Sequence, residues 1–165
     1  IDPNRAKEQV KSVSEVVREG IQDVRGSLNR LRPGALEGRT LKDALEKMIR
    51  EYQTLSNLQV DLHYEWVDVD MDVMIEDTIF RVIQESMTNA VRHGHASQMS
   101  LHFFEDEEDY LIELQDNGVG FETLTYGYGL KQMMERISIL GGQLQFESRD
   151  GFFTRVSLPK YKEGR

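Results

Sequence analysis

The stretch 84-QESMTNAVRHGHAS-97 is the part of the sequence that most constrains fold and function. Its first half forms helix well and places Glu85, Asn89 and Arg92 at positions i, i+4 and i+7. On a helix this spacing aligns a carboxylate, an amide and a guanidinium along one face. The apolar residues of the same helix gather on the opposite side: Ile79, Val82, Ile83, Met87 and Ala90. Alone, the pattern predicts only an amphipathic helix.

Composition limits the classes of function. The 165 residues are 39% hydrophobic and 30% charged, which predicts one globular domain with a short appendage. No apolar run approaches the roughly 18 residues of a membrane span, and the N-terminal sequence does not resemble a signal peptide. The absence of cysteine excludes disulfides and thiol nucleophiles. A net charge of -9 argues against nucleic-acid binding, so a phosphate ligand would need backbone amides, a metal or a few local cations.

Residues 5–32 are predicted to form one long helix. Its apolar residues recur every seven positions: Val10, Val17, Val24 and Leu31. Such a repeat favours a seam against partner helices in a bundle or dimer, although a helix lying on the core of its own domain is an alternative. Pro33 and Gly34 end the helix.

The rest of the chain predicts a mixture of helices and strands. Helices are expected over 40–56, from Asp77 or Thr78 to 93, and over 130–140; strands over 58–67, 99–104, 110–115, 143–148 and 152–158. Residues 116–129 are a glycine-rich loop, and 159–165 are expected to be a frayed tail. This order lacks strict βαβ alternation. It predicts an α+β fold, a two-layer sandwich with helices on one face of a mixed or antiparallel sheet.

The segment 116-DNGVGF-121 follows directly on a predicted strand. Gly118 and Gly120 permit backbone conformations that other residues avoid and allow a flat ligand to approach closely. Asp116, at the end of the strand, offers an acceptor suited to an exocyclic amine such as that of adenine. A simple tight turn is the alternative.

A second glycine-rich segment, 126-YGYGLKQMMERI-137, runs into a helix. The free amides around Gly129, Leu130 and Lys131 favour anionic oxygens, with Lys131 and Arg92 as nearby cations. Asn89 supplies a neutral oxygen of the kind that Mg²⁺ accepts. Thr154, in 151-GFFTRV-156, carries a hydroxyl that could help to fix a base.

In this order and spacing, QESMTNAVRH, DNGVGF, YGYGL and GFFT resemble the N, G1 and G2 boxes and the terminal Gly-x-x-Thr of the GHKL (Bergerat-fold) ATP-binding domain. The match is most similar to sensor histidine kinases of the NarX and DesK group. Residues 27-SLNRLRP-33 resemble the second helix of the dimerisation and phosphoacceptor hairpin in that group. The resemblance implies a sandwich with three helices on one face of a mixed sheet, preceded by one long helix, with domains over 1–33 and 34–165.

The resemblance also implies a role for each matching residue. Glu85 would orient or polarise a water or the reacting centre, and Asn89 would be catalytic as the Mg²⁺ ligand. Asp116 would accept from the adenine amine with support from Thr154, and Gly127 and Gly129 would hinge a lid. The implied nucleotide-binding residues are Arg92, His93, Asp116, Gly118, Gly120, Gly127, Tyr128, Gly129, Leu130, Lys131 and Thr154.

The function implied is transfer of the γ-phosphoryl group of Mg-ATP to a histidine and then to an aspartate of a response regulator. The partners would be that regulator, the phosphoacceptor helix of the same kinase and a second kinase chain in a homodimer. The fragment would be cytoplasmic, in a parent protein anchored in the cell membrane. None of His63, His93, His95 and His102 fits the phosphoacceptor pattern, so this chain should not phosphorylate itself.

Two alternatives remain open. Glu85 could act as the base for ATP hydrolysis, as in GHKL chaperones and topoisomerases. The chain could also be a non-catalytic dimerising module with a vestigial pocket. A zinc site is not predicted, because no pair of histidines has ligand spacing backed by acids.

Overall fold

A computed structural model describes residues 36–67 and 69–160 of the protein. These residues belong to one compact unit, Ala35–Arg165. The predicted helix over 5–32 lies outside the described residues, and the proposed domain division near residue 33 stays a prediction.

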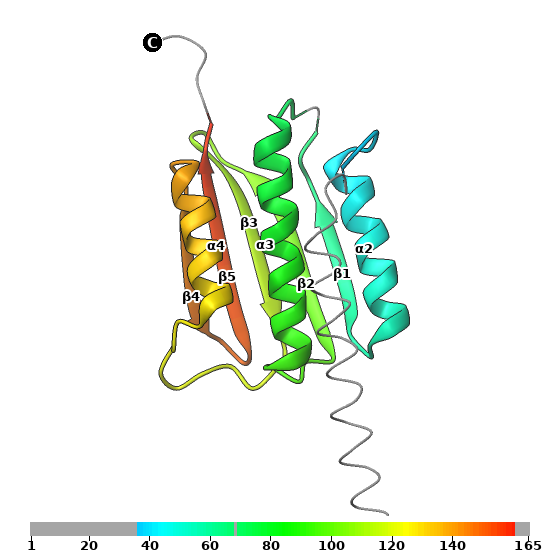
Figure 1. The fold of residues 1–165 in the computed structure, drawn as a ribbon, viewed down its shortest axis with the longest axis vertical. Coiled ribbons are helices and arrows are strands. Elements are labelled where there is room, and N and C mark those ends of the chain that lie inside the picture. Colours follow the sequence, from blue (N-terminus) through cyan, green and yellow to red (C-terminus); the bar gives the residue numbers. More distant parts are fainter. Residues whose placement is uncertain (1–35, 68, 161–165) are drawn as a thin grey trace, which may run out of the picture. The chain divides into compact units, whose positions relative to one another are not determined.

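The described chain contains three helices and a five-stranded sheet (Figure 1). In chain order the elements are α2 (Leu41–Leu55), β1 (Gln59–Tyr64), α3 (Val73–Arg92), β2 (Gln98–Glu105), β3 (Asp109–Asp116), α4 (Tyr128–Ile139), β4 (Gln143–Ser148) and β5 (Phe152–Pro159). The strand order is β1-β2-β3-β5-β4, and only the β1–β2 pair is parallel. The sheet is therefore mixed, which confirms the predicted α+β class.

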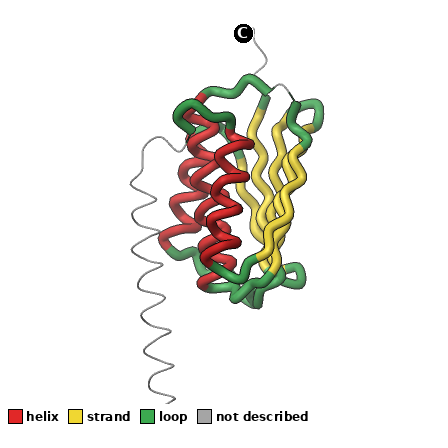
Figure 2. Tube along the Cα trace, turned by 90° about the vertical axis from the view of Figure 1, so that its right-hand side faces the viewer, coloured by secondary structure: helices red, strands yellow, loops and turns green. Residues whose placement is uncertain are grey.

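The helices form one layer and the strands the other, as Figure 2 shows from the side. Alternate residues of the central strands are almost completely buried beneath the helices: Leu101, Phe103, Ile112, Leu114 and Val156. The α3 stripe predicted from the sequence packs onto them, with Ile79, Ile83 and Met87 all inaccessible to solvent. Burial of this stripe fixes the rotation of α3, so the opposite line of polar residues faces away from the sheet.

The start of α3 was predicted wrongly. The helix begins at Val73, not at Asp77 or Thr78, because the Asp72 carboxylate accepts a hydrogen bond from the amide of Met74 at 2.7 Å. Val73 and Met74 are exposed, so this first turn lacks the apolar periodicity of the rest of the helix. By contrast, Thr40 is the N-cap of α2, at the start expected for the helix over 40–56.

Three other boundaries also differ from the predictions. The strand expected over 58–67 ends at Tyr64, and the helix expected over 130–140 begins at Tyr128. The predicted frayed tail begins too early, because Pro159 ends β5 and the amide of Lys160 donates to Glu108 O at 2.8 Å. Within the described ranges, no helix combines the length and apolar character that crossing a membrane requires.

Candidate nucleotide-binding site

The end of α3, the end of β3 and the start of α4 meet at one end of the sandwich (Figure 1). Asp116 is the last residue of β3 and is only 6% exposed. Its Oδ1 accepts hydrogen bonds from the amides of Gly118, at 2.7 Å, and Phe152, at 3.1 Å. Among residues 36–67 and 69–160, nothing bonds to its second oxygen. One half of this carboxylate therefore holds the turn, and the other half is available to a donor.

Thr154 lies beside Asp116 in the sheet. It is 2% exposed and pairs with Leu114, two residues before Asp116 on β3. Its hydroxyl likewise has no hydrogen-bond partner in the described part of the chain. Buried polar groups without partners are rare, because each costs about 1–3 kcal/mol. Two such groups on neighbouring strands fit the edge of a base that carries an amino group, which is the ligand expected from the sequence.

The turn after Asp116 packs directly on the backbone that follows α3. The amide of Val119 donates to Gly94 O at 3.0 Å. A Cβ atom on Gly118 would lie 2.5 Å from the same oxygen, so glycine is required by contact at this position. The predicted glycine turn and the end of the polar helix are thus brought together.

Gly120 packs against the turn that joins β4 to β5. It has φ +61°, and a Cβ there would lie 2.5 Å from Ser148 Oγ and 2.7 Å from Gly151 O. The Ser148 hydroxyl accepts a hydrogen bond from the amide of Phe121 at 3.1 Å. Gly151 has φ +139°, and a Cβ there would lie 1.9 Å from Asp116 O. The chain around Asp116 is therefore closed by backbone contacts that only glycine allows.

The predicted lid spans residues 121–129, and its loop portion, 121–127, rests on an aromatic cluster. Phe121 contacts Phe152 with ring centroids 5.2 Å apart, and Phe152 contacts Phe146 at 5.6 Å. Tyr126, near the other end of the lid, meets Phe146 edge to face at 6.3 Å. Both ends of the lid thus lie against the β4–β5 hairpin.

The start of α4 faces the polar line of α3. Gly127 is the N-cap and makes no side-chain capping bond, and the first turn of the helix contains no acidic residue. Glu85 lies against this turn, because a Cβ on Gly129 would be 2.1 Å from Glu85 Oε1. The helix start is therefore a region of positive partial charge, with a carboxylate of α3 directly beside it.

The other predicted site residues lie at the same end with different exposure. Asn89 and Arg92 are half-buried on α3, and His93, the C-cap, is exposed. Tyr128 and Lys131 are exposed, and Gln132 donates to the Tyr128 hydroxyl at 2.7 Å. Gly127 has φ -69° and open space around its Cα, so this conformation does not require glycine. Its role as a hinge stays a prediction.

A metal would have few protein ligands here. In the described part of the chain, no cluster of three or more His, Asp or Glu side chains could hold an ion. The Asn89 side chain has no hydrogen-bond partner within the same residues and lies one turn after Glu85 on α3. This matches Mg²⁺, which keeps several waters and is held jointly by one or two protein groups and the phosphates of a substrate.

Sequence reasoning missed several residues that build the site. Gly94, Ser148 and Gly151 enclose Asp116 or the turn that follows it, and Asn117 ties that turn to β2. Asn117 Oδ1 accepts from the amides of Ser97 and Gln98, both at 2.9 Å. All of them except Ser148 lie within the quoted stretches QESMTNAVRHGHAS, DNGVGF and GFFT, but no role was predicted for any of them.

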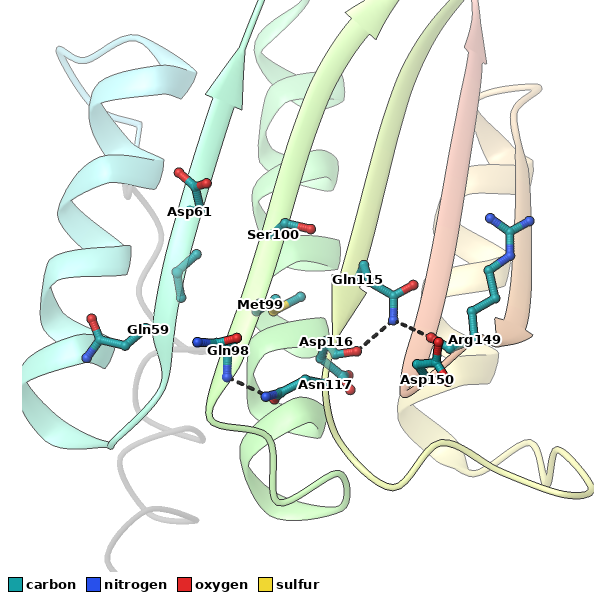
Figure 3. Close-up of a pocket in the computed structure, with 11 residues that line it drawn as sticks. Gln59, Asp61, Gln98, Met99, Ser100, Gln115, Asp116, Asn117, Arg149 and Asp150 are labelled. Atoms are coloured by element: carbon teal, nitrogen blue, oxygen red, sulfur yellow. Dashed lines mark hydrogen bonds between the residues drawn. The ribbon is translucent and has the colours of Figure 1, made fainter.

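A depression of about 730 Å³ lies on the other face of the sheet, behind Asp116 (Figure 3). Its walls include Gln98, Gln115, Asn117 and Arg149, and no residue of α3 or α4 lines it. The side-chain Nε2 of Gln115 donates to Asp116 O at 2.6 Å and to Arg149 O at 2.9 Å. Asp116 also lines the depression, and these two bonds tie its backbone to the turn between β4 and β5 on the face opposite α3 and α4.

Residues 74–162 match the family described as histidine kinase-, DNA gyrase B- and HSP90-like ATPases. A histidine-protein kinase/phosphatase of Salmonella typhimurium, UhpB, is 34% identical over 95% of this chain and 32% of its own length. The sensor histidine kinase LiaS of Bacillus subtilis is 28% identical over 94% of this chain and 43% of its own length. The chain therefore spans less than half of these curated relatives.

Solved structures show the same fold. The histidine kinase AdeS of Acinetobacter baumannii has a TM-score of 0.64 at 19% identity, covering 98% of this chain and 87% of that chain. The ATP-binding domain of PrrB from Mycobacterium tuberculosis has a TM-score of 0.61 at 20% identity, covering 73% and 93%. At these identities the similarity concerns the fold alone.

Proposed function

We propose that this chain, which belongs to the histidine kinase-, DNA gyrase B- and HSP90-like ATPases, is the ATP-binding catalytic part of a two-component sensor histidine kinase. In this proposal the γ-phosphoryl group of ATP passes to a histidine of the kinase and then to an aspartate of a response regulator. The phosphoacceptor helix, a second kinase chain and the regulator are the proposed partners. A membrane-anchored parent protein is also proposed.

One observation carries the proposal. The second oxygen of Asp116 and the hydroxyl of Thr154 are buried, lie on neighbouring strands and lack partners in the described chain. An adenine amino group would donate to Asp116 and relieve the cost of burying that oxygen. The adjoining glycine turn allows the base to approach the backbone closely.

The phosphates are proposed to lie between α3 and the start of α4. The free amides of Tyr128, Gly129 and Leu130 would donate to phosphate oxygens, and Lys131 and Arg92 would add positive charge. Asn89 would supply an oxygen to Mg²⁺, which neutralises phosphate charge when bound. This chain's residues would then contribute mainly by positioning the nucleotide and stabilising its charge.

Titration with a non-hydrolysable ATP analogue tests the proposal. Binding to the wild type should strengthen when Mg²⁺ is added, and Asn89→Ala should lose most of that strengthening. Asn57→Ala is the matched control, because it removes the same group from an exposed position between α2 and β1. No binding to the wild type, or equal Mg²⁺ dependence in both variants, would contradict the proposal.

ATP hydrolysis is the second candidate, because Glu85 lies against the first turn of α4, where the terminal phosphate would be. Steady ATP turnover that disappears in Glu85→Gln would favour hydrolysis. Transfer of phosphate to a separately supplied phosphoacceptor domain, without turnover in its absence, would favour the kinase. Incubation with labelled ATP should leave no phosphohistidine on this chain itself.

A further inference from the structure

The outer strand of the sheet, β1, leaves backbone groups open. It pairs with β2 alone, and the amides of Gln59 and Glu65 donate to Ser97 O and Phe103 O, both at 2.8 Å. In a parallel pair every second residue directs its backbone N–H and C=O groups to the neighbouring strand. In β1 these are the odd-numbered residues, so Val60, Leu62 and Tyr64 direct their N–H and C=O groups outward. Gln53 Nε2 donates to Val60 O at 3.4 Å. No described residue bonds to the outward groups of Leu62 or Tyr64.

A groove runs along this open edge. Helix α2 lies beside β1 (Figure 1), and the two elements enclose a volume of about 540 Å³. The lining residues are Lys42, Glu46, Ile49 and Arg50 of α2, with Leu62, His63, Tyr64 and Glu65. Open backbone groups beside such a groove are the features that bind an extended peptide by strand addition.

Two exposed acids, one on β1 and one directly after it, lie along the open edge. Asp61 and Glu65 project from the face of the sheet opposite the helices, and their side chains are 74% and 64% exposed. Each is paired with a histidine ring: Asp61 with His63 at 3.0 Å and Glu65 with His102 at 2.7 Å. Among the described residues, no lysine or arginine is paired with either carboxylate. Basic side chains on an added strand would lie beside these two acids.

The inner side of the groove combines a buried apolar residue with two basic residues and one acidic residue. Ile49 is buried, and Glu46 is 3.7 Å from Arg50 in an ion pair. Lys42 lies 5.7 Å from the centre of the Tyr64 ring. Burial, reinforced by Glu76, raises the pKa of Tyr64 to about 12, so this phenol is neutral at physiological pH. Aliphatic side chains on an added strand suit this wall.

We propose that the groove between β1 and α2 binds an extended segment of another protein, which adds to β1 as a further strand. The segment carries basic side chains opposite Asp61 and Glu65, and aliphatic side chains opposite Leu62 and Tyr64. A second copy of this chain fits less well, because it would bring the same acids to the edge and a further net charge of -9.

Calorimetric titration of the chain with two synthetic peptides tests the proposal. The sequence acetyl-Lys-Val-Thr-Val-Lys-amide places lysines opposite the two acids and valines opposite Leu62 and Tyr64. The comparison peptide replaces both lysines by glutamates. We expect the lysine peptide to bind at least about tenfold more tightly, because the charge on the outer face changes sign. Equal binding of both peptides, or binding of neither, would overturn the proposal.

Methylated forms of the lysine peptide separate strand addition from general attraction to an acidic protein. One peptide carries N-methyl groups on the backbone amides that would face β1, and the other carries them on the alternate amides that would face solvent. One of the two methylated peptides should lose binding, and the other should retain it. Retention by both, or loss by both, would show that backbone pairing does not carry the binding.

Variants of the protein complete the test. Leu62→Pro removes an outward amide without removing a bond to β2, and should weaken the lysine peptide about tenfold with ATP-analogue binding retained. If that variant fails to fold, the double variant Asp61→Lys with Glu65→Lys should reverse the preference between the peptides. An unchanged preference would refute the proposal. Dimerisation of the wild type that Leu62→Pro abolishes would show that a second copy takes the edge instead.

Discussion

Two aspartates at opposite ends of the sheet hold their turns in the same way. Asp106, between β2 and β3, accepts hydrogen bonds on Oδ1 from the amides of Glu108 and Asp109, at 2.9 and 2.8 Å. Asp116, at the far end of β3, accepts on Oδ1 from Gly118 and Phe152, at 2.7 and 3.1 Å. In each turn one oxygen takes both backbone bonds and the other is left over.

Burial distinguishes the two turns. Asp106 is exposed, so its second oxygen is open to solvent. Asp116 is 6% exposed and adjoins the buried hydroxyl of Thr154, so its second oxygen is largely withheld from solvent. A carboxylate that holds a turn therefore becomes a candidate binding site when its remaining acceptor oxygen is enclosed.

The largest effect is expected from a substitution that disrupts the backbone packing around Asp116. Gly151→Ala would place a Cβ 1.9 Å from Asp116 O at a φ of +139°, and should lower the free energy of unfolding by about 3 kcal/mol. Gly127→Ala is the control, because nothing lies within 4 Å of its added Cβ, and its change should stay within about 0.5 kcal/mol. Urea unfolding measures both. Similar values for the two variants would show that Gly151 does not hold the turn closed.

The second largest effect is expected from a substitution that keeps the turn after β3 but replaces the free acceptor oxygen of Asp116 by a hydrogen-bond donor. Asp116→Asn can retain the Oδ1 bonds while presenting an amide donor to the base. Affinity for an ATP analogue should fall about a hundredfold, which corresponds to about 2.7 kcal/mol. Asp106→Asn should leave that affinity unchanged. Titration of both variants measures the difference, and undiminished binding by Asp116→Asn would favour the non-catalytic module.

The smallest expected effect concerns the exposed turn. Hydrogen bonds from the amides of Asp109 and Glu108 lower the pKa of Asp106. A carboxyl group whose pKa is lower in the folded state stabilises the fold above its unfolded pKa of about 3.9 and loses this contribution as the pH falls through the folded value. Wild type should therefore lose slightly more stability in acid than Asp106→Asn. Urea midpoints at neutral and acidic pH measure this, and identical acid sensitivity would contradict it.

The sequence predicts the parts of the site whose signals are local. The polar line of Glu85, Asn89 and Arg92 follows from helical spacing, and the turn after Asp116 from its glycines. The α+β class follows from the order of the periodic segments. The buried α3 stripe confirms the orientation that was predicted for this helix.

The sequence does not predict contacts that depend on tertiary packing. Gly151 and Ser148 meet the Asp116 turn only because β5 pairs with β3, and neither the GFFT motif that begins at Gly151 nor the sequence around Ser148 predicts this contact. The sequence predicts Asn117 only as a turn residue, but its side-chain Oδ1 accepts hydrogen bonds from the backbone at the start of β2. The beginning of α3 was missed because Asp72 caps a turn whose side chains are exposed.

The pairing of β3 with β5 has a consequence for hydrogen exchange. Asp116 and Thr154 sit on strands with neighbours on both sides, whereas the predicted lid between β3 and α4 is a loop. Amides of such central strands open only with large-scale unfolding, and loop amides open far more often. A bound nucleotide would then slow deuterium uptake mainly in the lid, against strands that already exchange slowly in its absence.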